Sequence, residues 1–193
     1  MPSYSADWFA GHAPLWERLL ARYRGKPRLR FLEIGSFEGR SAVWLLTNVL
    51  THPTSRLVCV DTFEGSDEHR EMGMNLGGVY ERFLENVAPF AARVRVLRGP
   101  SQEVLRSRRL RSESLHFAYV DGSHRARDVL EDAVLAFRLL KPGGLLIFDD
   151  YCWGPGREET TRPRLAIDAF LSVYRDAYVL LHLGYQVAVA KTA

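Results

Sequence analysis

The stretch that most constrains the fold of this chain is Phe31–Gly39, with the sequence FLEIGSFEG. A short apolar run ends at Gly35, and Gly39 follows where we expect a helix to begin. Glycine tolerates positive φ and lets a ligand approach the backbone closely, and a helix N-terminus offers free N–H groups. The stretch therefore predicts a strand, a tight turn and a helix that together form a ligand site.

The charge beside this turn indicates which ligand to expect. Glu33 would repel a phosphate and attract a cationic amine. The turn also lacks the middle glycine of GxGxxG, the fingerprint of dinucleotide sites, because it reads Gly35-Ser36-Phe37-Glu38-Gly39. Both features favour S-adenosylmethionine over a nicotinamide dinucleotide, although a nicotinamide-dependent oxidoreductase stays an alternative.

Apolar runs alternate with helix-period segments along the chain, which is typical of an α/β domain with a mostly parallel sheet. We expect five parallel strands, at residues 29–34, 56–61, 94–97, 116–121 and 145–148. Two further apolar runs, 177–183 and 186–190, are too close in sequence for a crossover helix and so predict an antiparallel pair. The expected fold is a Rossmann-like three-layer sandwich whose seven-stranded, mostly parallel sheet ends in an antiparallel C-terminal strand pair.

Length and composition fit one domain. A chain of 193 residues is long enough for one buried core and short for two. We take residues 1–193 as a single domain in which residues 1–28 form an N-terminal helical cap segment. No apolar run approaches the roughly 20 residues of a membrane span, and the N-terminus lacks the layout of a secretory signal. We therefore expect a cytoplasmic protein with no membrane partner.

The net charge of +3 raises the question of a nucleic-acid partner. Arginines crowd the stretch Arg93–Arg111 and could neutralise phosphates. Lysine is scarce throughout, however, and the stretch has no interleaved aromatic residues of the kind that stack on single strands. We interpret the arginines as solvated surface and expect a small-molecule substrate rather than a nucleic acid. Whether the protein forms a homo-oligomer remains open.

Carboxylates stand at the ends of most of the predicted strands. In open parallel sheets, ligands bind outside the carboxyl ends of the strands, so these residues are candidate site residues. Asp61 ends a strand one βα unit after the glycine turn, where an acid can accept both hydroxyls of a ribose. An aspartate at this position also serves as a turn cap, which is the alternative interpretation.

Asp121, Asp149 and Asp150 would converge if their two strands are neighbours. Their mutual repulsion would raise at least one pKa, and a hard divalent cation such as Mg²⁺ would relieve it. Such a cation could bind a substrate hydroxyl and favour its deprotonation. His124 could then act as the general base. The alternative is that these aspartates cap the following segments and that His124 is solvated.

Three motifs in this order resemble class I S-adenosylmethionine-dependent methyltransferases: EIGSFEG, CVDTFEGSDEH and YVDGSHRARDVLEDAVLAFRLLKPGGLLIFDDY. The likeness is strongest to the small bacterial group that includes antibiotic sugar O-methyltransferases. Catechol O-methyltransferases are more distantly similar. The resemblance extends over roughly Leu29–Trp153.

The resemblance implies a cofactor-binding set made up of Glu33, Gly35, Ser36, Gly39, Asp61, Thr62, Ser101 and Asp121. Within this set the residues of the glycine turn would surround the methionine part, Asp61 would bind the ribose, and Ser101 would lie near adenine. Asp121, Asp149 and Asp150 match the metal ligands of metal-dependent relatives. His124 matches a base proposed in sugar O-methyltransferases, and with Asp121 it forms the expected catalytic pair.

We therefore predict an S-adenosylmethionine-dependent O-methyltransferase, assisted by Mg²⁺, that acts on a small-molecule hydroxyl such as that of a sugar or another natural product. A non-catalytic S-adenosylmethionine-binding protein is an alternative, as is methylation of RNA or protein. Because the chain is short, the acceptor has to be covered by the N-terminal segment, by Thr62–Gly78 or by Tyr151–Arg162. We expect Tyr151 and Trp153 in the wall of its pocket.

Overall fold

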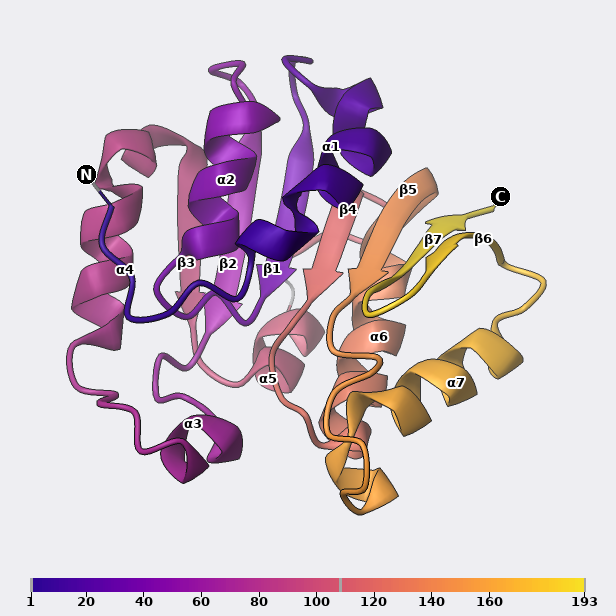
Figure 1. Ribbon diagram of the computed structural model, residues 1–193. Coiled ribbons are helices and arrows are strands. Elements are labelled where there is room, and N and C mark those ends of the chain that lie inside the picture. Colours follow the sequence, from indigo (N-terminus) through magenta and orange to yellow (C-terminus); the bar gives the residue numbers. More distant parts are fainter. Residues whose placement is uncertain (1, 108, 193) are drawn as a thin grey trace.

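A seven-stranded sheet with the strand order β3-β2-β1-β4-β5-β7-β6 forms the centre of the computed structural model, which describes residues 2–107 and 109–192 (Figure 1). The strands are β1 (Arg30–Ile34), β2 (Arg56–Asp61), β3 (Val94–Arg98), β4 (Leu115–Val120), β5 (Leu140–Phe148), β6 (Tyr178–Leu183) and β7 (Val187–Lys191). Strands β1 to β5 pair in parallel, whereas β7 is antiparallel to both β5 and β6. The predicted architecture is confirmed.

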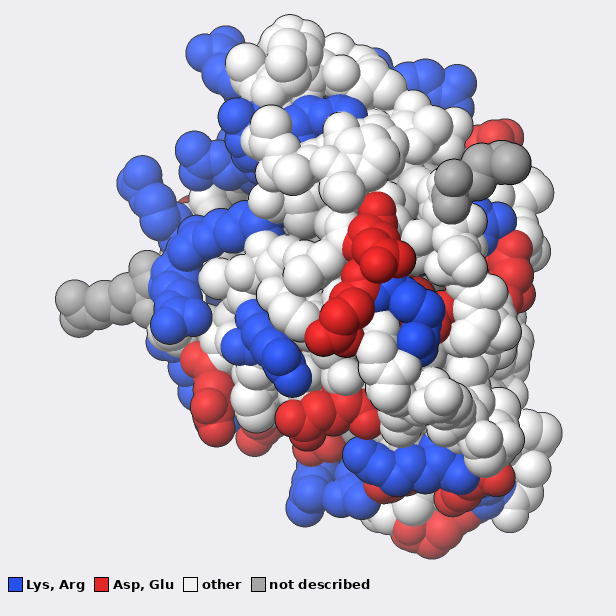
Figure 2. Space-filling model, turned by 90° about the vertical axis from the view of Figure 1, so that its left-hand side faces the viewer, with Lys and Arg blue, Asp and Glu red and all other residues white. Residues whose placement is uncertain are grey.

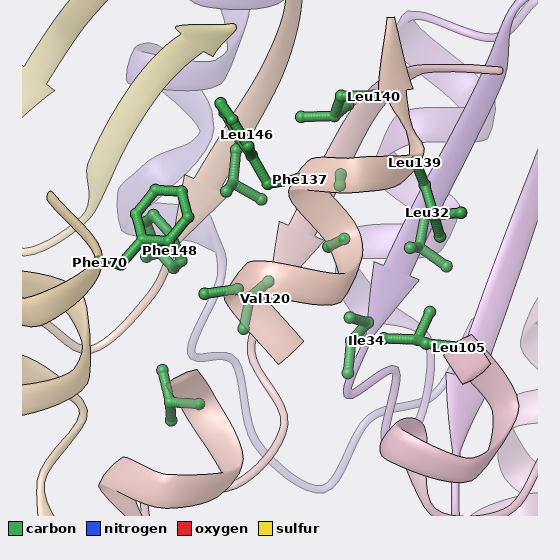
Figure 3. Packing of buried hydrophobic residues seen from close by; sticks show 14 of the residues in the cluster. Leu32, Ile34, Leu105, Val120, Phe137, Leu139, Leu140, Leu146, Phe148 and Phe170 are labelled. Carbon is green, nitrogen blue, oxygen red and sulfur yellow. The ribbon is translucent and has the colours of Figure 1, made fainter. Parts of the chain in front are cut away.

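Helices cover both faces of the sheet, as Figure 1 shows. On one face lie α1 (Ala13–Leu20), α2 (Arg40–Asn48) and α4 (Val79–Val87), and on the other lie α5 (Ser101–Arg106), α6 (Ala126–Leu139) and α7 (Pro163–Val173). Side chains alternate along each strand, so Phe31 is buried in the first layer and Leu32 in the second. The second layer is closed by aromatic contacts of Phe170 with Phe137 and Phe148, both at 5.3 Å between ring centroids (Figure 3).

The N-terminal segment is less helical than predicted. Helical turns occupy only η1 (Ala10–His12), α1 and η2 (Ala21–Tyr23), and residues 2–9 form a non-helical strap. Their backbone is held by side chains instead of by helical hydrogen bonds: Asn86 Oδ1 accepts from Ser3 N at 2.8 Å, and Glu38 Oε2 accepts from Ser5 N at 2.6 Å. The expectation of a helical segment over residues 1–28 is therefore wrong for this part.

Strand β5 begins earlier than predicted, at Leu140 instead of Leu145. Leu140 is fully buried and pairs with Leu115, so α6 passes directly into the strand. The pairing register shifts between Leu115 and Phe117, and the segment Lys141–Gly144 occupies that irregularity. Proline and glycine are tolerated there because the ladder is already interrupted.

Three shorter elements lie in the connections: α3 (Asp67–Glu71), η3 (Ala88–Arg93) and η4 (Glu159–Thr161). Within the part of the chain that the structure describes, no helix is both long and apolar enough to cross a membrane. The register aligns Ile34 with Val60 and with Val120, and Val120 with Phe148. The residues that follow these four therefore stand side by side at one edge of the sheet, where the candidate site lies.

Candidate active site

A cavity of about 660 Å³ opens at the carboxyl edge of the sheet. Most predicted site residues line it: Gly35, Ser36, Asp61, Thr62, Ser101, Asp121, His124, Asp149 and Asp150. Glu33 and Gly39 are not in its wall. The structure thus brings the two halves of the predicted site, the glycine turn and the acidic strand ends, into one cavity.

The backbone geometry of the turn requires Gly35. Its φ is +83°, and a Cβ built there would lie 1.8 Å from the carbonyl oxygen of Asp121. The turn and the end of β4 are therefore in direct backbone contact. Gly39 has φ +81° as well and is the N-cap of α2, where it packs against Phe83. Its role is in the packing of the turn.

Glu33 is fully buried below the turn. Its carboxylate accepts hydrogen bonds from the Ser36 and Ser41 hydroxyls, both at 2.6 Å. Burial raises the pKa of Glu33 to about 7 although these hydrogen bonds oppose the shift. Ser36 and Ser41 line the cavity and Glu33 does not, so the two hydroxyls stand between the Glu33 carboxyl and the cavity.

Asp61 ties β2 to the glycine turn. Its Oδ2 accepts the backbone N–H groups of Ser36 and Phe37, each at 2.7 Å, and its Oδ1 accepts that of Phe63 at 2.7 Å. This is the turn-capping role considered above as the alternative to ribose binding. Because a carboxylate has about four acceptor positions, Asp61 can cap the turn and still accept a ligand hydroxyl.

The ends of β4 and β5 bring the predicted acidic cluster together. Asp149 Oδ2 accepts from the Tyr119 hydroxyl and from Gln186 Nε2, the latter at 2.9 Å, and its Oδ1 accepts from Asp150 N at 2.7 Å. Burial raises the pKa of Asp121 well above its ordinary value, and the negative charges of Asp149 and Asp150 add to the shift. The sequence had led us to expect such a perturbation.

The negative charge of this cluster suits a metal ion, but the arrangement of its side chains does not. No group of three or more His, Cys, Asp or Glu side chains in residues 2–107 and 109–192 is placed to hold one ion. The oxygens of Asp149 and Asp150 are already engaged by protein hydrogen bonds. The three carboxylates thus fit a cation in charge but not, as they stand, in arrangement.

His124 lies beside Asp150 and is largely buried. Its Nε2 is 2.8 Å from Asp150 Oδ2, while the other oxygen of Asp150 accepts from the Tyr185 hydroxyl at 2.9 Å. Burial alone would lower the pKa of His124, but the hydrogen bond and charge of Asp150, with Glu68 assisting, raise it. The ring packs on Trp153 at 4.1 Å between centroids, and its Nδ1 is buried with no hydrogen-bond partner.

The cover of the cavity comes from the three segments that the sequence indicated. The N-terminal segment contributes Trp8 and His12, the segment after β2 contributes α3 with Glu68, and the loop after β5 contributes Trp153. Tyr151 is absent from the wall, contrary to expectation. Its hydroxyl instead donates to Asp168 of α7 at 2.8 Å.

Several residues of the wall were not predicted from the sequence, among them Tyr4, Arg40, Glu68 and Tyr185. Glu68 carried a detectable signal, since it follows Ser66 in a short acidic run that can start a helix after an N-cap serine. Tyr185 lies in the three-residue connection of the antiparallel pair, Gly184–Gln186. Nothing in the sequence of that connection indicates that it would reach Asp150.

Part of the arginine-rich stretch is engaged with the protein itself, and Arg108 lies outside the described residues. Arg93 donates to the carbonyl oxygens of Leu46 and Leu50 at the end of α2, and Arg106 pairs with Glu131 at 3.3 Å. Figure 2 shows the face to the left in Figure 1, where Lys and Arg side chains predominate in the upper and left part and Asp and Glu side chains lie mainly toward the centre and the lower part. The interpretation of the stretch as solvated surface stays a prediction.

Comparison with known proteins identifies the family. A family model described as a methyltransferase domain matches residues 32–151, which contain the glycine turn and the acidic strand ends. The chain belongs to this methyltransferase family. The predicted recognition is therefore confirmed. No protein with a curated description matches the chain.

Solved methyltransferases share the fold at low sequence identity. The O-methyltransferase TomG of Streptomyces achromogenes, involved in tomaymycin synthesis and solved in complex with SAM, has 18% identity and a TM-score of 0.68, with coverage of 100% of this chain and 84% of that chain. An O-methyltransferase of Bacillus cereus in complex with SAH has 20% identity and a TM-score of 0.64, covering 98% and 84%. The O-methyltransferase NovP has 17% identity and a TM-score of 0.68, covering 92% and 76%.

Proposed function

We propose that this methyltransferase transfers the methyl group of S-adenosylmethionine to a hydroxyl of a small molecule, with His124 as the general base. One observation carries the proposal: the hydrogen-bonded pair His124–Asp150 opens into the same cavity as the glycine turn. A cofactor bound at the turn and an acceptor bound at the pair would share one enclosed space.

The cofactor assignment is supported by the geometry of the turn. Gly35, Ser36 and Ser41 line the cavity, and the two serine hydroxyls are backed by the buried carboxyl of Glu33, which favours a cationic amine. Asp61 ends β2 and Thr62 follows it, and both are assigned to the ribose. Ser101, which follows β3, is assigned to the adenine side. Two of the solved proteins of this fold were obtained with SAM or SAH.

In the proposed mechanism, the acceptor oxygen lies in line with the methyl group and its proton passes to His124. Asp150 orients the imidazole, and its charge stabilises the imidazolium that forms. Holding both reactants in one cavity can supply about 7–11 kcal/mol of the barrier reduction in favourable cases. Proton removal by a positioned base typically contributes roughly 10²–10⁴-fold. The acceptor end is walled by Trp153 and Tyr185, whose rings can pack on a sugar or an aromatic natural product.

Assistance by Mg²⁺ remains a prediction within this proposal. Asp121, Asp149 and Asp150 are the residues that would hold the ion, once the hydrogen bonds of Asp149 and Asp150 rearrange. A bound cation would act as a Lewis acid toward the acceptor hydroxyl. The general-base step derived above uses only His124 and Asp150 and does not depend on it.

The cellular location of the protein and its binding partners are also part of the proposal. Both cysteines, Cys59 and Cys152, are free thiols, which is compatible with the reducing cytoplasm that we expect. We still expect neither a membrane nor a nucleic acid as a partner. Whether the protein forms a homo-oligomer stays open.

Calorimetric titration with S-adenosylhomocysteine, first with Mg²⁺ and then with a chelator, tests the cofactor and the metal together. Micromolar binding is the expected result, and a screen of hydroxylated acceptors with labelled methyl donor would follow. Absence of binding in both conditions would contradict the proposal. Lower activity after chelation, restored by Mg²⁺, would support the metal. Binding without transfer to any acceptor would favour a non-catalytic binding protein, and heat on titration with NADH would favour an oxidoreductase.

A further inference from the structure

Three aromatic rings meet beside the glycine turn, in the wall of the cavity. Phe37 of the turn stacks on His69 of α3, with 4.7 Å between the ring centroids and 7° between the ring planes. Trp8 of the N-terminal strap lies 5.5 Å from Phe37 and 5.3 Å from His69. All three residues line the cavity, and the mechanism proposed above gives none of them a role. Trp8, Phe37 and His69 together are called the aromatic cluster below.

The backbone of Phe37 has a conformation that is uncommon for a bulky residue. Its φ is +43°, in the left-handed region that favours glycine. Asp61 holds this conformation, because its Oδ2 accepts the backbone N–H groups of both Ser36 and Phe37 at 2.7 Å. Strained backbone of this kind concentrates at functional sites. The strain therefore indicates that the aromatic side chain at this point of the turn contacts a ligand.

The neighbours of Phe37 indicate which part of the cofactor it faces. Ser36 and Ser41, backed by Glu33, are assigned to the amine of the methionine part, and Asp61 is assigned to the ribose. In S-adenosylmethionine the sulfonium sulfur joins the methionine part to the ribose. The sulfur must therefore cross the turn between the two serines and Asp61, which is where Phe37 lies.

The electrostatics of the aromatic cluster suit a positive charge. The face of an aromatic ring attracts a cation that lies within about 6 Å of its centre. Burial lowers the pKa of His69, and its Nδ1 accepts from Ser66 N at 3.0 Å, so this imidazole is neutral and brings no opposing charge. The sulfonium of S-adenosylmethionine carries a positive charge, whereas the thioether of the product, S-adenosylhomocysteine, carries none.

We propose that the aromatic cluster binds the sulfonium of S-adenosylmethionine, with Phe37 as the contacting ring and with Trp8 and His69 keeping that ring in place. The cluster then contributes to binding of the methyl donor and not to binding of the demethylated product. This inference rests on the proposed cofactor. It goes beyond it by assigning a role to three residues outside the predicted cofactor-binding set and by stating which form of the cofactor they select.

Calorimetric titration with three ligands tests the proposal. S-adenosylmethionine has the positive sulfonium, sinefungin has an amine-bearing carbon in its place, and S-adenosylhomocysteine has the neutral thioether. Phe37→Leu keeps an apolar side chain but removes the aromatic face. It should weaken binding of both cationic ligands by roughly threefold to thirtyfold more than binding of S-adenosylhomocysteine. Trp8→Leu, at a ring that is 50% exposed, should change the same ratio in the same direction without disturbing the core.

Phe63→Leu is the matched control. Phe63 also has a left-handed backbone, with φ +60°, and also donates its N–H to Asp61, but it is buried and is not in the cavity wall. Any loss in this variant should be equal for the three ligands.

The outcomes separate this proposal from that of the cofactor. Equal losses for the three ligands in Phe37→Leu would overturn the role of the aromatic cluster and leave the cofactor assignment standing. A loss confined to S-adenosylmethionine would overturn it as well, because it would report a contact with the methyl group and not with the charge. If the parent protein binds none of the three ligands, the proposed cofactor itself is wrong.

Discussion

Nε2 of His124 and Oδ2 of Asp150 lie 2.8 Å apart, although 26 positions separate them in sequence. His124 follows β4 and Asp150 follows β5, so their contact depends on the parallel pairing of these two strands. Asp150 takes a left-handed backbone conformation, with φ +59°, that is uncommon for a residue other than glycine. Such strained conformations concentrate at functional sites, which agrees with the role given to the pair.

Replacement of His124 tests the base directly. His124→Asn should lower kcat by roughly 10²–10⁴-fold because no other group in the cavity is assigned to take the proton. Affinity for S-adenosylhomocysteine, measured by calorimetry, should change less than about threefold. His52→Asn, at a partly exposed histidine that is not in the cavity wall, is the matched control. A parallel loss of kcat and cofactor affinity would assign His124 a structural role.

The pH dependence of turnover follows from the pKa of His124. Contacts with Asp150 and Glu68 raise this pKa above the ordinary value of 6.5, and only the neutral imidazole can accept a proton. We therefore expect kcat to rise with pH through an apparent pKa above 6.5. Asp150→Asn removes the largest raising contribution and should move this pKa downward. A profile that is flat between pH 6 and 9 would contradict the assignment of the base.

Glu33 gives the stability of the protein a pH dependence of its own. Its pKa is about 7 in the folded chain against an ordinary value of 4.5, so the folded state binds the proton more tightly than the unfolded state. Stability should therefore fall as pH rises from about 4.5 to 7, by up to about 3 kcal/mol. Glu33→Gln should flatten that part of the curve in urea unfolding experiments. A variant that follows the parent curve would show that Glu33 ionises normally.

Alanine at Gly35 should be far more damaging than alanine at another glycine with positive φ. At Gly143, φ is +75° and an added Cβ meets nothing within 4 Å, so the cost is the backbone strain of roughly 1–2 kcal/mol. At Gly35 the Cβ would collide with the backbone of Asp121, and we expect at least about 2 kcal/mol more. Equal midpoints of urea unfolding for the two variants would contradict the close approach.

Asp61→Ala separates the two roles of this carboxylate. Loss of its hydrogen bonds to Ser36 N, Phe37 N and Phe63 N should lower the free energy of unfolding of the ligand-free protein by about 2–3 kcal/mol. Cofactor affinity should fall as well, because the turn loosens and a ribose acceptor is lost. A residue that only bound ribose would leave the ligand-free stability unchanged.

Much of the fold could be predicted from local patterns. The alternation of apolar runs and helical segments identified seven strands, and the boundaries of β2 agree with the prediction, Arg56–Asp61. The start of β5 was misplaced because Lys141–Gly144 has the composition of a helix stop, and only the pairing of Leu140 with Leu115 reveals a strand. The strap over residues 2–9 was misassigned for a similar reason, since its partners Glu38 and Asn86 are distant in sequence.

The candidate site was predictable where it depends on strand ends and not where it depends on loops. Parallel strands bring their ends to one edge, so Asp61, Asp121 and Asp149 could be assigned to one site from sequence order alone. The path of a loop over the sheet is set by tertiary contacts, and for that reason Glu68 and Tyr185 were missed. The same limit explains why Tyr151 was expected in the wall although it turns toward α7.

The contact between Gly35 and the carbonyl of Asp121 has a consequence for how ligands enter. With no space between the two loops, neither can shift without the other, and together they act as a fixed floor beneath both reactants. Entry and exit must then depend on the cover, which consists of the N-terminal strap, the short helix α3 and the loop after β5 that carries Trp153. Because Trp8 of the strap contacts His69 of α3, we expect these two covering segments to move together when a ligand enters.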